Sequence, residues 1–223
     1  MKNERFELRE GFTAEPLPED IREYMNGRTY RENVHIGLDD LSYLKIRYVD
    51  FSHNVADGAM VVHKSLAREV LEIFEMLFDA EYEIDKIRLC DDYEGDDERS
   101  MADDNTSAFN FRNVADTETL SLHALGSAID INPLYNPYIV GEKVSPANGL
   151  QYCNRENSFA HKIDHEDLCY KVFQAKGWLW GGDWQSSKDY QHFYKPRNNP
   201  IKSAVEKIKD LVADQHRQGG SQG

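Results

Sequence analysis

The chain has 223 residues, of which 40% are hydrophobic and 30% are charged. This composition is apolar enough to build a folded core and argues against global disorder. The formal net charge of -14 produces a field that repels phosphate backbones, so general nucleic-acid binding is disfavoured.

The sequence carries no membrane or export signal that we can identify. No apolar run approaches the roughly 18 residues that a membrane helix needs, and the first residues, MKNERFELREGFTAEP, lack the apolar core of a signal peptide. Three cysteines, Cys90, Cys153 and Cys169, stand at unrelated spacings without a CxxC pair. They favour buried or half-buried thiols over a thiolate zinc knuckle or a full disulfide framework, but they do not exclude one disulfide bridge.

Residues 1–40 are polar and irregular, apart from a short helix predicted at Ile21–Tyr24 after the turn-forming PLPED. We expect them to form an N-terminal extension that packs on the main domain. Alternating apolar and polar residues then predict a strand over Leu44–Phe51, and a second short strand is predicted over Ala59–His63.

The strongest helix pattern covers Ser65–Asp79, with Ser65 as its predicted N-cap. Apolar side chains recur along one face of this helix, at Leu66, Val70, Ile73, Phe74 and Leu77. Ile84–Cys90 follows as a predicted strand. The acidic stretch 91–105 lacks the spacing of an EF-hand loop, so we interpret it as a solvated loop.

Ser107–Arg112 (SAFNFR) alternates again, with Phe109 and Phe111 on one face and Arg112 on the other, which indicates a strand that lines a site. A second helix is predicted over Ile163–Lys176, with Leu168, Val172 and Ala175 on one face and Gly177 as its stop. A third amphipathic helix is predicted over Ile201–Val212.

Helices and short strands mix without a regular strand–helix alternation, and no glycine-rich phosphate loop occurs. This pattern favours an α+β fold with a mostly antiparallel sheet. No linker rich in proline, glycine or serine divides the chain, so we expect one domain over residues 41–213. A disordered tail is expected over 214–223, which contains RQGGSQG.

The segment from Ser121 to Pro133 places His123 and Asp130 seven residues apart around small residues. Asp130 interrupts an apolar run, and burying its charge costs several kcal/mol unless a cation or hydrogen-bond donors compensate. A metal is one such compensation. By itself this His would be an ordinary core or surface residue, and Asp130 could form an Asx turn.

A second carboxylate and imidazole lie three residues apart, at Asp189 and His192. In an extended strand this odd separation would place them on opposite faces. They can converge only if Asp189 lies on the turn that leads into the strand. At least two of the three tryptophans of the preceding segment, residues 178–184, are interpreted as core packing.

Together the two segments offer two His and one Asp as ligands, plus a further carboxylate. Catalytic zinc takes three protein ligands and keeps one position open for the reactive water. Zinc lowers the pKa of that water toward roughly 7, and a neighbouring carboxylate can then take its proton. Arg112 could stabilise the oxyanion that develops during hydrolysis.

The pattern Ser-x-His-x-x-Gly-x-Ala-x-Asp, from Ser121 to Asp130, resembles the signature of the M15 metallopeptidases. These are the VanY/VanX-like D-Ala-D-Ala peptidases and the L-alanyl-D-glutamate endopeptidases of bacterial walls and phage lysins. The runs SAFNFR, DINPLYNPY and DYQHF are similar to the same family. The resemblance spans residues 50–193.

This resemblance implies zinc on three ligands, His123, Asp130 and His192. It also implies Asp189 as the general base, Arg112 as a catalytic residue that binds the substrate and the oxyanion, and Ser121 as a residue that holds the peptide. The implied fold is a small antiparallel sheet that carries the zinc site, with helices packed against it, as in Hedgehog/DD-peptidase-like domains.

The expected function is hydrolysis of the stem peptide of bacterial peptidoglycan by a zinc-dependent M15 peptidase. The D-Ala-D-Ala dipeptidases of the family generally have Glu as the base, so Asp189 favours the L-alanyl-D-glutamate endopeptidases. A VanY-like D-alanyl-D-alanine carboxypeptidase is the first alternative, and a non-catalytic zinc-containing binding module is the second. We expect a monomer that acts outside the cytoplasm, with any export signal absent from this chain, or a phage-type lysin made inside the cell.

Overall fold

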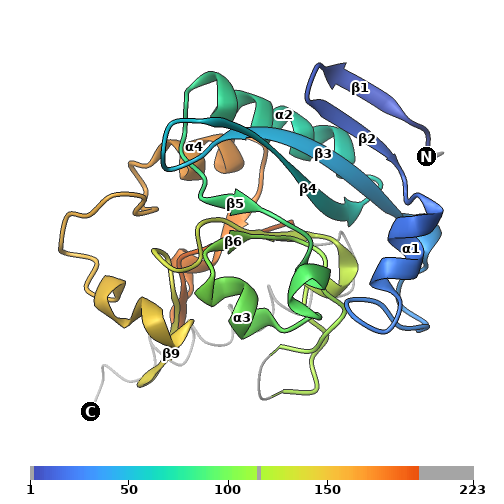
Figure 1. The fold of residues 1–223 in the computed structure, drawn as a ribbon. Helices are drawn as coiled ribbons and strands as arrows, with labels where there is room; N and C mark the ends of the chain where they lie inside the picture. The colour runs from blue at the N-terminus through green and yellow to red at the C-terminus, as the bar shows by residue number, and fades with distance from the viewer. Residues whose placement is uncertain (1–2, 115–116, 196–223) are drawn as a thin grey trace, which may run out of the picture.

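Residues 3–114 and 117–195 are described by the computed structural model of the chain (Figure 1). They form the expected mixed α+β fold, with small antiparallel sheets and helices packed against them. The helix predicted over 201–212 and the tail over 214–223 lie outside the described residues. Within those residues, no helix is long and apolar enough to cross a membrane.

The largest sheet has four antiparallel strands in the order β1-β2-β3-β4. The strands are β1 (Phe6–Arg9), β2 (Phe12–Pro16), β3 (Leu41–Val49) and β4 (Val55–His63). The two later strands confirm both predicted strands, with shifted ends. The two earlier ones show that the interpretation of residues 1–40 as irregular was wrong. Only two apolar residues mark β2, Phe12 and Ala14, and they become buried opposite Ile46 and Leu44 of β3.

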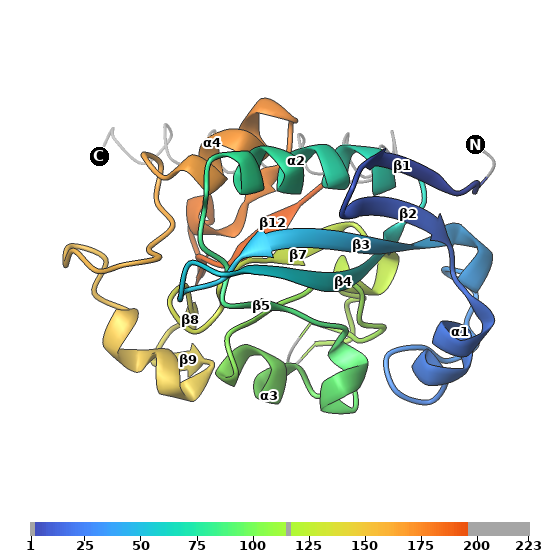
Figure 2. The same cartoon turned by 45° about the horizontal axis from the view of Figure 1, so that its top comes forward.

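Helix α2 (Ala67–Asp79) covers one face of this sheet (Figure 2). Its buried face carries Val70, Leu71, Ile73, Phe74 and Leu77. The helix begins at Ala67, so the predicted N-cap Ser65 lies outside it. The Oγ of Ser65 instead contacts Nδ1 of His63 at 2.7 Å. The opposite face of the sheet is partly covered by α1 (Glu19–Met25), which contains the predicted Ile21–Tyr24 helix.

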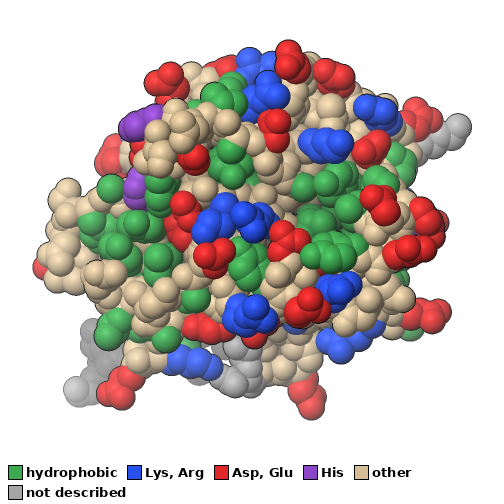
Figure 3. Space-filling model, in the orientation of Figure 1, with side chains coloured by type: hydrophobic (Ala, Val, Ile, Leu, Met, Phe, Trp, Pro, Cys, Tyr) green, Lys and Arg blue, Asp and Glu red, His purple; other side chains and the backbone are tan. Residues whose placement is uncertain are grey.

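The acidic stretch 91–105 is not the solvated loop that was expected. It contains the end of a 3-10 helix at Cys90–Tyr93 and then helix α3 (Asp97–Ala102). Asp91 and Asp104 are buried, and Asp91 accepts a hydrogen bond from Oγ1 of Thr29 at 2.7 Å. These acidic side chains are therefore used inside the fold. The Asp and Glu side chains spread over the surface in Figure 3 carry much of the net negative charge.

Two predicted strands next to this stretch are shorter than expected. The strand predicted over Ile84–Cys90 is reduced to β5 (Lys86–Ile87), which pairs in parallel with β6 (Asn105–Thr106). Ser107–Arg112 is not a regular strand, since Ser107 alone forms a bridge, to Asp130. Its alternation survives, because Phe109 and Phe111 both pack in the cluster beneath α1.

The C-terminal half contains two three-stranded sheets, ordered β10-β12-β7 and β11-β8-β9. Strands of the first are β7 (Ala128–Asp130), β10 (Leu179–Trp180) and β12 (His192–Tyr194). Strands of the second are β8 (Tyr138–Val140), β9 (Lys143–Ser145) and β11 (Lys188–Asp189). Three short 3-10 helices lie between the strands of this half, at His123–Leu125, Ala147–Tyr152 and Gly181–Asp183. Another 3-10 helix, Leu38–Asp40, precedes β3 of the large sheet.

Helix α4 (Leu168–Ala175) is shorter than the predicted Ile163–Lys176 helix, because the Asp167 carboxylate caps it by accepting from the backbone N–H of Cys169. Its buried face is Cys169, Val172 and Phe173, whereas the predicted face included Leu168 and Ala175, which are exposed. Gly177 follows with φ +75°, as expected for the residue that ends a helix. Trp178 and Trp180 are in the core, and all three cysteines are free.

Candidate metal centre

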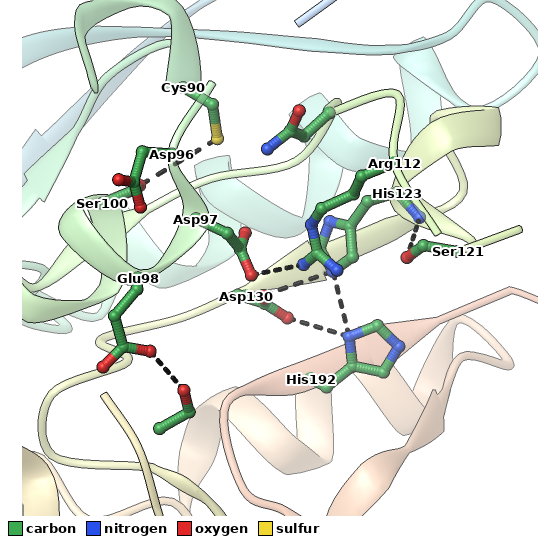
Figure 4. Close-up of polar contacts among 12 residues, drawn as sticks. Cys90, Asp96, Asp97, Glu98, Ser100, Arg112, Ser121, His123, Asp130 and His192 are labelled. Atoms are coloured by element: carbon green, nitrogen blue, oxygen red, sulfur yellow. Dashed lines mark hydrogen bonds and ion pairs between the residues drawn. The ribbon is translucent and has the colours of Figure 1, made fainter. Parts of the chain in front are cut away.

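Two histidines and one aspartate converge where β7 meets β12 (Figure 4). His192 stands directly opposite Asp130 in the antiparallel pair, and His123 begins the 3-10 helix that precedes β7. All three side chains are buried. The sheet register therefore brings together the three residues that were predicted as metal ligands.

The donor atoms of these residues lie within 4.8 Å of one another. His123 Nε2 is 3.2 Å from Oδ2 of Asp130, and His192 Nδ1 is 2.9 Å from Oδ1 of the same carboxylate. The two imidazole nitrogens are 3.1 Å apart. Two nitrogens and one carboxylate oxygen aimed at a common point suit a divalent metal such as zinc.

The ring of His123 is oriented by the main chain. Its Nδ1 lies 2.5 Å from the backbone carbonyl oxygen of Ala108. Because a carbonyl can only accept, Nδ1 must carry the proton, which leaves the lone pair of Nε2 free to coordinate. Ser121 also supports this residue, since its Oγ accepts from the backbone N–H of His123 at 3.2 Å. The structure thus places the predicted substrate-binding serine against the loop that carries His123.

Asp130 and His123 shift each other's pKa. Burial acts to raise the pKa of the Asp130 carboxyl, but the His123 and His192 imidazoles beside it hold that pKa well below its usual range. Burial acts to lower the pKa of His123, and the Asp130 carboxylate overcomes this effect and raises it. The buried Asp130 charge is thus compensated by positive charge, which a divalent cation also supplies.

Asp189 is the last residue of β11 and lies close to the ligands. The prediction placed Asp189 on the turn that leads into the strand of His192, but Asp189 does not lie on that turn. Instead it ends its own short strand, and Tyr190 and Gln191 then lead into β12. Its Oδ1 is buried and has no hydrogen-bond partner among the described residues. Burial, reinforced by the Asp130 charge and opposed by His192, raises the pKa of Asp189 to about 7.

Gly181 shows how closely the chain is packed around Asp189. A Cβ atom at Gly181 would lie 2.7 Å from Cβ and from the backbone oxygen of Asp189, and 3.3 Å from Cβ of His192. The first two distances are too short for real carbon contacts. Glycine is therefore required at this position if Asp189 is to stay beside the metal ligands.

Arg112 points toward the same centre from the segment after β6 (Figure 4). Its Nη2 lies 2.6 Å from Oδ2 of Asp97, while its Nε is buried and has no partner in the described part of the chain. Burial acts to lower the pKa of Arg112, but the charges of Asp97 and Asp130 raise it. Asp97 was missed by sequence reasoning, which assigned it to a solvated loop.

A cavity of about 620 Å³ lies elsewhere, on the face of the large sheet opposite α2. Its lining includes Thr13, Tyr43 and Lys45 and contains none of the six predicted site residues. This cavity is therefore separate from the candidate metal centre.

Buried histidines and an aspartate that can share a metal, with a further carboxylate beside them that has an oxygen without a partner among the described residues, are typical of a hydrolytic metal site. Residues 115–195 match the family model described as D-alanyl-D-alanine carboxypeptidase. This match confirms the M15 resemblance over the segment that holds the metal ligands, and the M15 peptidases are hydrolases. Searches of curated proteins and of solved structures found no match.

Proposed function

We propose that the chain is a zinc-dependent peptidase that hydrolyses the stem peptide of bacterial peptidoglycan. The observation that carries this proposal is the buried Oδ1 of Asp189, which has no hydrogen-bond partner among the described residues and lies beside the group of His123, Asp130 and His192. A structural zinc site takes four protein ligands, whereas this group has three among the described residues. Three ligands and an adjacent base suit a catalytic site.

His123 Nε2, a carboxylate oxygen of Asp130 and His192 Nδ1 would hold the metal. When bound, zinc supplies a Lewis acid that polarises the scissile carbonyl and lowers the pKa of water. Asp189 accepts a proton from the attacking water at its free Oδ1 and later delivers it to the leaving amine. A pKa near 7 suits a group that must both take and give a proton at neutral pH.

Arg112 is proposed to bind the substrate and to stabilise the oxyanion. Its guanidinium keeps a full charge in a chain whose net charge is -14, and its buried Nε has no hydrogen-bond partner in the described chain. Stem peptides carry free carboxylates, which a guanidinium binds through charge-assisted hydrogen bonds. Ser121 is proposed to contact the peptide through its hydroxyl hydrogen, since its Oγ lone pair already accepts from His123.

The bond that is cut has two candidates. Asp189, in a place where the dipeptidases of the family generally have Glu, favours an L-alanyl-D-glutamate-type endopeptidase, and this is the bond we propose. The description of the matching family model favours the terminal D-alanyl-D-alanine bond instead. A non-catalytic zinc-containing binding module is the third possibility, and it gives no reason to leave Oδ1 of Asp189 and Nε of Arg112 buried without a hydrogen-bond partner in the described chain.

One experiment separates these three outcomes. The zinc content of the purified chain is measured by elemental analysis, and the zinc-loaded chain is incubated with purified muropeptides whose products are read by mass spectrometry. An endopeptidase releases a fragment that begins at D-glutamate, whereas a carboxypeptidase releases free D-alanine. A zinc-loaded chain that leaves every muropeptide unchanged would contradict the proposed activity and indicate a binding module.

Because peptidoglycan lies outside the membrane, we place the proposed activity in the cell envelope. A phage-type lysin that is made in the cytoplasm and later reaches the wall fits equally well. All six proposed site residues come from one chain, so we propose that a monomer is active. Sedimentation of the zinc-loaded chain, combined with activity at several dilutions, tests the last point.

A further inference from the structure

Two neighbouring carboxylates in the first turn of α3 hold two different segments of the site (Figure 4). Asp97 Oδ2 lies 2.6 Å from Nη2 of Arg112. Oε1 of Glu98 accepts from the backbone N–H of Ala147 at 2.8 Å, and its Oε2 accepts from Oγ of Ser145. One side of α3 therefore contacts Arg112, and the next residue along contacts the end of β9.

The contact at Ser145 leads directly to Asp189. Ser145 stands opposite Tyr138 in the β8–β9 pair, and Tyr138 stands opposite Asp189 in the β8–β11 pair. These three residues thus form one row across the small sheet, and Glu98 extends the row by a hydrogen bond. Neighbouring strands are about 4.8 Å apart, so a shift of Ser145 would be passed to Asp189 over roughly 10 Å.

Helix α3 itself is well anchored. Ser100 and Met101 are buried, and Oγ of Ser100 accepts from Nδ2 of Asn105 at 3.0 Å. The Asp96 side chain caps the helix by accepting from the backbone N–H of Arg99. At the other end, Nδ2 of Asn148 donates to the carbonyl of Ala102 at 3.0 Å. A short helix fixed at both ends can act as a rigid spacer.

We propose that α3 sets the separation between Arg112 and Asp189 across the metal centre. Asp97 is the positioning residue for Arg112, and Glu98 is the positioning residue for Asp189. This inference rests on the proposed function, because it assumes that Arg112 and Asp189 act on one substrate. It adds two residues, Asp97 and Glu98, that are not among the six site residues implied by the M15 resemblance.

The first test concerns Asp97 in the zinc-loaded chain with a muropeptide substrate. Asp97→Asn removes the charge that holds Arg112, so kcat/KM is expected to fall about tenfold to a hundredfold, mainly through KM, with unchanged zinc content. Asp97→Glu, which keeps the charge, is expected to recover part of this loss. In the Arg112→Ala background Asp97→Asn should cost little more, because the two residues act as a pair.

The second test concerns Glu98. Glu98→Ala removes the hydrogen bonds that hold Ser145 and Ala147, and with them the support of the row that ends at Asp189. We therefore expect kcat to fall about tenfold while KM and zinc content stay unchanged. Glu142→Ala is the matched control, because Glu142 is an exposed glutamate in the turn between β8 and β9 and stands outside the row of Ser145, Tyr138 and Asp189. Equal effects of the two substitutions would show that the row does not position Asp189.

A readout without substrate separates this inference from the proposed function. Hydrogen exchange followed by NMR in the zinc-loaded chain should show faster exchange of the Arg112 Nε–H in Asp97→Asn. It should also show faster exchange of the β8 and β11 amides in Glu98→Ala, but not in Glu142→Ala. A chain without peptidase activity would contradict the proposed function alone. Unchanged exchange in both variants, or equal losses from Asp97→Asn with and without Arg112, would overturn the role of α3.

Discussion

The β1–β4 sheet with α2 and the region around the metal ligands are built in different ways. The sheet uses two nine-residue strands and a long helix, and apolar side chains such as Leu44, Met60 and Phe74 fill the space between them. The metal-site region uses strands of two or three residues joined by 3-10 helices. The first region buries apolar surface in regular elements, whereas the second arranges polar side chains at fixed positions.

Unpaired buried atoms make the contrast sharper. Of the six buried side-chain atoms without a hydrogen-bond partner among the described residues, three lie around the metal ligands: Oδ1 of Asp189, Nε of Arg112 and Oε1 of Gln191. One, Nε of Arg9, lies in the sheet region, at the end of β1. Each such group costs about 1–3 kcal/mol of folding free energy. We infer that the apolar sheet and helix supply the stability that allows the second region to keep these groups available for a ligand.

The largest expected effect breaks the metal site and leaves the sheet intact. His123→Ala removes Nε2 from the donor set, so zinc retention and peptidase activity should both fall to background. Far-UV circular dichroism should still report a folded chain. The matched control is His35→Ala, because His35 is exposed and lies outside the site. Stoichiometric zinc in the His123→Ala chain would show that this residue is not a ligand.

The next effect separates the base from the metal. Asp189→Ala should keep the zinc content and lower kcat by about 10²- to 10⁴-fold, the range typical of a general acid–base group. Asp39→Ala, at a carboxylate whose side chain is 88% exposed, should change neither quantity. Near-full activity of the Asp189→Ala chain would rule out the proposed mechanism.

A third substitution tests whether the sheet region carries the stability. Phe74→Ala opens a cavity between α2 and the sheet and should lower the free energy of unfolding by about 3–5 kcal/mol. The fraction that remains folded should still bind zinc stoichiometrically. Met76→Ala, at an exposed position of the same helix, should change the free energy by less than about 0.5 kcal/mol. If folded Phe74→Ala protein loses zinc, the two regions are coupled.

The smallest effect depends on pH. Burial raises the pKa of Asp104 to about 7, and its Oδ2 has no partner among the described residues. In the unfolded chain this carboxyl titrates near pH 3.9. The folded state therefore binds the extra proton between these values, and stability falls as pH rises from about 4 to above 7. Asp104→Asn should remove this loss, on the order of 1–3 kcal/mol at pH 8.5, as denaturant unfolding at pH 5 and 8.5 would show. An identical pH dependence in the variant would contradict this assignment.

Periodic sequence features predicted the regular region well. The α2 stripe and the alternation of β3 and β4 are visible because each repeats over nine or more residues. Strands β1 and β2 were missed, because Phe12 and Ala14 become a strand face only by pairing with residues about thirty positions later.

The site was predicted from order and chemistry, and not from periodicity. The charge of Asp130 inside an apolar run indicated a compensating cation, and the structure brings its two predicted partner histidines to it. Asp97 could not be distinguished from the other acidic residues of 91–105, since its role depends on the approach of Arg112 fifteen residues later. The predicted strand that carries Arg112 was wrong, although the side chain still faces the site.

The contact between His123 and Ala108 has a consequence for mutational tolerance. The group that fixes the tautomer of His123 is a backbone carbonyl, and every amino acid has one. No single side-chain substitution can delete this acceptor. A substitution scan at position 108 would therefore detect how large a side chain fits there, but not the role of the carbonyl. The orientation of this ligand is therefore encoded in the path of the main chain, and it would be lost through insertions or deletions near residue 108 sooner than through point substitutions.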